Sequence, residues 1–187
     1  LASKTEGAND HNLPMLVWAG IHPLVKNAPN RLIGLARATE WPQLRTWVAR
    51  AITERFTENP LAFDALLDLV GDQAGHSDSL LTGVERAVLG IKEFTKPAKW
   101  DTVRSKLGTN PTVLKLSVFF GDERAAEKME KVVVNAQEDP IIRRQTLQIL
   151  IDSESPNLQS LCKKLLKDSN MQGIAARGLS RFEDAEI

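Results

Sequence analysis

The sequence of 187 residues predicts an all-α protein, and three features of the chain lead to that prediction. Apolar residues return every three or four positions along most of the chain, which is the spacing of one helix face. At four places a residue that caps helices stands directly before a proline, and this pair is typical of a helix start. No stretch alternates apolar and polar residues for long enough to indicate a β-strand.

The helical faces are clearest in three segments. The range 158–166 carries apolar residues at positions i, i+3, i+4, i+7 and i+8, with lysines on the opposite side. The ranges 80–94 and 125–133 repeat this spacing, and the second follows an acidic helix start that favours the helix dipole. The stripe of the first segment consists of Leu158, Leu161, Cys162, Leu165 and Leu166. We expect each stripe to be buried against a neighbouring helix.

The cap–proline pairs divide the chain into short helices. They are Asn59-Pro60, Asn110-Pro111, Asp139-Pro140 and Ser155-Pro156, and Pro29 and Pro42 mark further starts without a polar cap. The pattern predicts about ten helices of about 10–16 residues, which are too short to be stable alone in water. We therefore expect the helices to be stabilised by packing on one another.

A repeat is visible in the second half of the chain. Asn110, Asp139 and Asp168 are each 29 residues apart, and the segment from Trp41 to Arg45 aligns with the segment from Asp139 to Arg143. Such a repeat predicts an α-α superhelix of HEAT-like (ARM/HEAT-type) helical pairs, in which each pair covers the next. The alternative is an irregular helical bundle. We expect residues 1–9 to be a loose N-terminal tail and residues 10–187 to form one HEAT-like helical repeat domain.

Charge and composition argue against several classes of function. The chain has 24 Lys and Arg and 24 Asp and Glu, so its formal net charge is zero. This balance argues against binding nucleic acid or a membrane surface through a strong basic field. The single cysteine excludes a disulfide within the chain and a cysteine-rich metal site. No apolar run approaches the roughly 20 residues of a transmembrane helix, so we expect no transmembrane segment.

Few residues are candidates for catalysis or metal binding. His11, His22 and His76 have no further ligand at a suitable spacing, so we favour structural roles, with His11 and Asn12 capping a helix start. The range 75–79 holds the residue types of a hydrolase triad, but adjacent residues cannot place the three groups in line. Cys162 lies on an apolar stripe, where a thiol acts as a small hydrophobe. We expect no catalytic residue, no metal site and no cofactor.

Arginines offer one more candidate surface. Arg45 and Arg143 occupy equivalent positions in the repeat and would project from the same edge of a superhelix. One interpretation is that they hold an anionic or protein partner along a groove. The other, which we favour, is pairing between repeats, because surface arginines are normally solvated or paired. The acidic residues available for pairing are Glu40, Glu54, Asp139 and Asp152.

Four segments together resemble a known family. They are the ranges 10–24, 41–45, 119–125 and 139–144. They resemble the HEAT-like helical segment of large bacterial proteins described as membrane-bound dehydrogenases, and the resemblance covers about residues 10 to 184. In that family the segment lies between a β-propeller similar to glucose/sorbosone dehydrogenases and a haem domain of cytochrome c type. The haem motif Cys-x-x-Cys-His is absent here, since Cys162 is followed by two lysines.

The resemblance implies a piece of a larger redox protein, exported, periplasmic or membrane-associated, in which the chemistry lies in the flanking domains. The sequence alone leaves the compartment unknown, and the chain begins without an initiator Met, which also leads us to expect an excised piece. We therefore expect a non-catalytic spacer or protein-interaction scaffold that binds another protein or neighbouring domains of the same polypeptide. The candidate binding residues are His11, Asn12, Trp18, Trp41, Arg45 and Arg143.

Two alternatives come from other functional classes. One is a DNA-binding domain of the alkylpurine DNA glycosylase type, in which Trp18, Trp41 and Trp47 would face damaged DNA, although zero net charge weighs against it. The other is a tetrapyrrole-handling module, as in the HEAT-like lyases that attach phycobilins.

Overall fold

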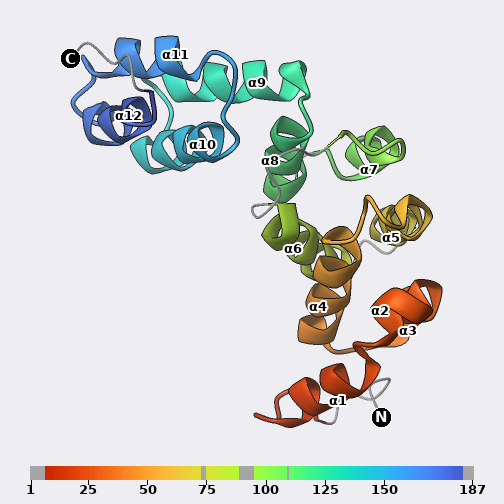
Figure 1. The fold of residues 1–187 in the computed structure, drawn as a ribbon. Helices are drawn as coiled ribbons and strands as arrows, with labels where there is room; N and C mark the ends of the chain where they lie inside the picture. Colours follow the sequence, from red (N-terminus) through yellow and green to blue (C-terminus); the bar gives the residue numbers. More distant parts are fainter. Residues whose placement is uncertain (1–6, 73–74, 89–94, 109, 183–187) are drawn as a thin grey trace. The chain divides into compact units, whose positions relative to one another are not determined.

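The computed structural model describes residues 7–72, 75–88, 95–108 and 110–182 of the chain, and within them every regular element is an α-helix. The prediction of an all-α protein is therefore confirmed (Figure 1). The helices contain 4 to 13 residues, so several are shorter than expected. They are α1 (Leu13–Ile21), α2 (Leu24–Asn27), α3 (Pro29–Ala38), α4 (Pro42–Thr53), α5 (Pro60–Asp72), α6 (Ser77–Val88), α7 (Trp100–Leu107), α8 (Pro111–Phe119), α9 (Glu123–Val134), α10 (Pro140–Asp152), α11 (Leu158–Leu165) and α12 (Gln172–Leu179).

Three of the four cap–proline pairs begin helices as predicted. The Oδ1 atom of Asn110 accepts the Thr112 amide at 2.9 Å, and Oδ1 of Asp139 accepts the Ile141 amide at 2.6 Å. Asn59 does the same for α5, where its Oδ1 accepts an amide of the first turn at 3.1 Å. These side chains satisfy backbone donors that have no partner within the helix.

The prediction for Ser155-Pro156 is wrong, because α11 begins at Leu158. Ser155 instead belongs to the end of α10, where its amide donates to the Leu150 carbonyl at 3.1 Å. Glu154 adopts a φ of 51°, and its amide donates to Ile151, so the two bonds close a Schellman turn. The sequence pattern did not indicate that Glu154 would adopt the left-handed conformation. With this turn in place, α11 begins at Leu158, two residues after the predicted start at Pro156.

The chain divides into two compact units, Leu1–Leu116 and Ser117–Ile187, and the boundary falls within α8. The first six residues of the expected tail lie outside the described residues. Residues 7–9 form a turn with Asp10, whose amide donates to the Gly7 carbonyl at 3.1 Å.

In the first unit the helices form two layers. One layer contains α3, α5 and α7, in which α5 packs on both others; the second contains α4 and α6 side by side (Figure 1). The helices α4 and α6 can approach closely at Gly83 because glycine has no side chain. A Cβ atom there would lie only 2.4 Å from the Thr46 carbonyl oxygen. At the N-terminal end α1 packs on α4 around the buried side chains of Trp41 and Leu44.

In the second unit α10 packs against α9 and α12, and α11 packs against α12. The stripe predicted in α11 is buried at four of its five positions; Leu166, just past the helix, is 40% exposed. Cys162 is fully buried, and this burial raises the pKa of its thiol. In the first unit the predicted stripe of α6 is buried as far as Val88, and its continuation, Ile91 and Phe94, lies outside the described residues.

Candidate functional site

The predicted residues at the N-terminal end lie around α1. His11 and Asn12 are exposed, and Asp10, not Asn12, caps the start: its Oδ1 accepts the amides of Asn12 and Leu13, each at 2.8 Å. These bonds hold the pKa of Asp10 below its ordinary value. The capping side chain is therefore that of Asp10, ahead of the predicted His11 and Asn12, and the side chains of both predicted residues lie at the surface.

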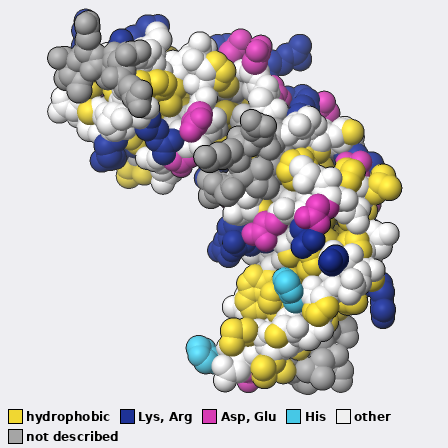
Figure 2. Space-filling view, in the orientation of Figure 1, with side chains coloured by type: hydrophobic (Ala, Val, Ile, Leu, Met, Phe, Trp, Pro, Cys, Tyr) yellow, Lys and Arg dark blue, Asp and Glu magenta, His cyan; other side chains and the backbone are white. Residues whose placement is uncertain are grey.

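The tryptophans are brought together in one hydrophobic cluster. Trp41 is fully buried, whereas Trp18 and Trp47 are partly buried against it, with their ring centroids 6.2 Å apart. The ring of His22 meets the Trp18 ring edge-on at 5.3 Å. Hydrophobic side chains also gather at the surface over the N-terminal helices (Figure 2), where Met15 is 59% exposed.

Arg45 connects three helices of the first unit. Its side chain is 5% exposed, and Nε donates to the carbonyl of Thr39, the residue that follows α3, at 3.0 Å. One terminal nitrogen donates to the hydroxyl of Ser79 in α6 at 3.4 Å. The other lies 4.0 Å from the Glu40 carboxylate. Burial lowers the pKa of Arg45, and the charge of Glu40 acts against this.

Arg143 makes the equivalent contacts in the second unit. Its side chain is 3% exposed, and Nε donates to the carbonyl of Val133 in the last turn of α9 at 2.8 Å. A terminal nitrogen donates to Oδ2 of Asp168 at 2.7 Å, ahead of α12. This bond holds the pKa of the Asp168 carboxyl below its ordinary value. Each arginine thus joins the end of the preceding helix to a residue near the start of a later helix, and the acidic partner of Arg143, Asp168, is not among those predicted.

The acidic partners differ in part from those predicted. Glu40 faces Arg45, Glu54 pairs with Arg50 at 2.7 Å, and Asp152 lies 3.8 Å from Arg181. Asp139 instead caps α10. A binding role for Arg45 and Arg143 stays a prediction, and their buried guanidinium groups would have to exchange contacts within the chain for contacts with a partner.

A groove that the sequence pattern did not indicate runs between α9 and α11 in the second unit. Two adjoining pockets of 270 and 380 Å³ form it and share the lining residues Glu127, Glu130 and Asn157. Glu123 and the turn at 155–157 line only the first pocket, whereas Val134 and Lys164 line only the second, apart from the shared Asn157. The two sides of the groove therefore advance in the same chain direction.

The groove has opposite charges at its two ends. Glu123, Glu127 and Glu130 line the first pocket, whereas Lys131 and Lys164 line only the second. Lys163 and Lys167 continue from Lys164 along the exposed side of α11. In the described part of the chain none of these seven side chains takes part in an ion pair.

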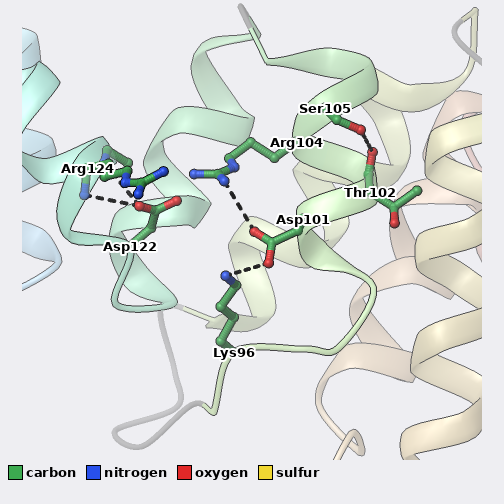
Figure 3. A network of polar contacts seen from close by, with 8 residues as sticks. Lys96, Asp101, Thr102, Arg104, Ser105, Asp122 and Arg124 are labelled. Atoms are coloured by element: carbon green, nitrogen blue, oxygen red, sulfur yellow. Dashed lines mark hydrogen bonds and ion pairs between the residues drawn. The ribbon is translucent and has the colours of Figure 1, made fainter.

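Several charged side chains outside the groove are paired locally. Asp101 receives Lys96 at 2.8 Å and Arg104 at 3.3 Å (Figure 3), and the bond with Lys96 lowers the pKa of Asp101. Asp122 caps α9 through the Arg124 amide at 3.1 Å (Figure 3). The charged side chains of the groove do not take part in ion pairs of this kind.

Ser155 is the second unusual feature of the groove. The residue is 5% exposed, lines the acidic pocket, and its hydroxyl is buried without a hydrogen-bond partner. Leaving a buried hydroxyl unsatisfied costs about 1–3 kcal/mol. The Schellman turn at Glu154 fixes the backbone on either side of this hydroxyl.

The sequence contained part of the signal for this groove, in the acidic start of α9 and the lysines of α11. What it lacked was the adjacency of the two helices. Among the described residues, no group of three or more His, Cys, Asp or Glu side chains is arranged to hold a metal ion. A search of the same residues finds no helix with the length and apolar character needed to cross a bilayer.

Comparisons of this chain with protein-family models, with curated proteins and with solved structures found no match.

Proposed function

We propose that this chain is a non-catalytic protein-interaction scaffold built from HEAT-like helical pairs. The groove between α9 and α11 is the observation that carries the proposal, because it combines unpaired charges of both signs with exposed apolar surface. Such a mixed surface is suited to a polypeptide, since charge complementarity fixes orientation and apolar contact adds affinity.

The packing supports the HEAT-like part of the proposal. Alternate helices contact one another, α3 with α5, α4 with α6 and α10 with α12, as expected where successive pairs stack. Arg45 and Arg143 add equivalent ties between successive pairs. In this view the partner is another protein or a neighbouring domain of the same polypeptide, and the resemblance to the helical segment of membrane-bound dehydrogenases suggests a redox protein as the larger context.

Site-directed photocrosslinking in the cells that produce the protein tests the scaffold role. A photoreactive residue at Val134, which is 53% exposed in the groove, should give a discrete crosslinked peptide pair with another protein or domain. Leu61, 78% exposed on α5, is the matched control and should give none of that product. Absence of any crosslinked peptide pair at Val134, Met15 and Leu166 alike would contradict the proposal.

Two binding experiments test the alternative functions, the glycosylase-like DNA-binding domain and the tetrapyrrole-handling module. Binding to duplex DNA at micromolar concentration and physiological salt would favour the glycosylase-like domain over a scaffold. A new visible absorbance band on adding haem or a bilin would favour the tetrapyrrole-handling module. We expect neither.

A further inference from the structure

The acidic end of the groove has the features of a receptor for a planar cation. Three carboxylates, the hydroxyl of Ser155 and the amide of Asn157 line a pocket of 270 Å³. These groups supply several hydrogen-bond acceptors, and the Ser155 hydroxyl has no partner within the protein. A metal ion fits poorly, because the carboxylates are not grouped as metal ligands.

An arginine side chain matches this pocket better than a lysine does. A guanidinium group carries five N–H donors in a fixed planar fork and binds carboxylates in pairs, whereas an ammonium is a compact, strongly hydrated charge. Several acceptors distributed around one pocket suit the fork. The pocket also adjoins protein surface on which the rest of a bound chain would lie.

The remainder of the groove determines which side chains should accompany that arginine in a bound segment. Beyond Glu130 the lining is both apolar, at Val134 and Leu161, and basic, at Lys131 and Lys164. From Asn157 to Lys164 the α11 side advances seven residues, or roughly 10 Å at about 1.5 Å per helical residue. An extended peptide covers about 13 Å in four residues, and its residues i, i+2 and i+4 share one face.

We propose that the α9–α11 groove binds an extended protein segment in which an arginine and an acidic residue stand two positions away on either side of an apolar residue. The arginine enters the pocket of Glu127 and Ser155, the apolar side chain packs on Val134 and Leu161, and the acidic side chain meets Lys164. The proposal rests on the protein-interaction role proposed above and names the chemistry of its partner.

Two synthetic peptides of equal composition test the pattern. The probe is acetyl-Thr-Arg-Thr-Val-Thr-Glu-Thr-amide, and the control exchanges its arginine and valine, so that the charged residues no longer flank the apolar one. Titration into the isotope-labelled full chain, followed by amide NMR shifts, should give saturable shifts at Ser155, Glu127 and Lys164 with the probe. The control should bind at least about tenfold more weakly. Equal binding of the two peptides, or no shift at these residues at millimolar peptide, overturns the proposal.

A charge-swapped protein provides the matched test. The double variant Glu127→Lys with Lys164→Glu keeps the net charge but mixes both signs at each end of the groove, because Glu123, Glu130 and Lys131 remain. It should lose the preference for the probe. The variant Lys128→Glu with Glu138→Lys makes the same exchange at residues that do not line the two pockets and should keep the preference of the wild type. If the exchange at Glu127 and Lys164 leaves the preference unchanged, the binding site lies elsewhere and the proposal is wrong.

Ser155→Ala separates binding from stability. Removing an unsatisfied buried hydroxyl should leave the free protein at least as stable as the wild type. The same change should weaken the binding of the probe peptide several-fold. Equal affinity for the probe would remove Ser155 from the site. If Val134 still gives its crosslinked product while the probe fails, only the peptide assignment falls; if both fail, the scaffold role falls with it.

Discussion

Arg143 should be one of the most important polar residues for the stability of the second unit. The change Arg143→Met keeps the length of the apolar stem but removes bonds of 2.8 Å to the Val133 carbonyl and 2.7 Å to Asp168. A hydrogen bond to a charged group contributes about 1.5–3 kcal/mol, and the Val133 carbonyl is left at a helix end without its partner. We expect a loss of about 3 kcal/mol in the free energy of unfolding.

Neighbouring and equivalent residues provide the controls. Arg144→Met removes only a 3.3 Å bond to the Asn170 carbonyl, so it should cost less than about 1 kcal/mol. Arg45→Met tests the equivalent tie in the first unit, where Nε holds the Thr39 carbonyl at 3.0 Å. The three losses in unfolding free energy can be compared with one another only if each variant is shown to be folded before denaturation.

The assay is urea unfolding followed by two probes. The four tryptophans, at 18, 41, 47 and 100, all lie in the first unit, whereas far-UV circular dichroism reports helices of both. Arg45→Met should therefore move the tryptophan fluorescence transition, and Arg143→Met should move the part of the circular dichroism transition that fluorescence does not follow. The reasoning is refuted if Arg143→Met costs no more than Arg144→Met.

The remaining predictions concern single residues. Gly83→Ala should destabilise the first unit by about 1–3 kcal/mol, because the added methyl meets the α4 backbone, whereas Gly34→Ala has open space and should stabilise α3 by about 0.5–1 kcal/mol; thermal melts decide. Glu154→Gly relieves a φ of 51° and should raise stability by about 0.5–1 kcal/mol, whereas Gly121→Ala, at a φ of 75°, should lower it; opposite signs in matched urea curves are required. Native Cys162 should react with a thiol reagent far more slowly than unfolded protein, and equal rates would show that it is accessible. Because pairing lowers the pKa of Asp168, its contribution is present above the unfolded carboxyl pKa of about 4 and is lost as pH falls through the lower folded value; Asp168→Asn should flatten acid unfolding in that range.

Much of the fold could be read from local sequence. Asn59, Asn110 and Asp139 begin helices because a capping oxygen and a following proline act within one turn. The Ser155 pair fails for a reason that is also local but less visible. Glu154 takes the left-handed conformation, and no glycine marks the turn.

The site could be predicted only in part. The register of the chain placed Arg45 and Arg143 at equivalent positions, and Glu40 was foreseen as a partner. Their main acceptors, however, are the carbonyls of Thr39 and Val133. A backbone carbonyl has the same chemistry at every residue, so sequence cannot indicate which one a side chain will reach.

By itself, the sequence determined where most helices begin and which of their faces are apolar, because caps and periodicity act over a few residues. The tertiary structure alone decided that the acidic side of α9 and the basic side of α11 line one groove. Glu127 and Lys164 are 37 residues apart in the chain, and their helices are brought together by packing on α10 and α12. It also buried Ser155 at the acidic pocket of the groove. Charges that stand in the sequence as two ordinary solvated faces thereby become the two ends of one groove.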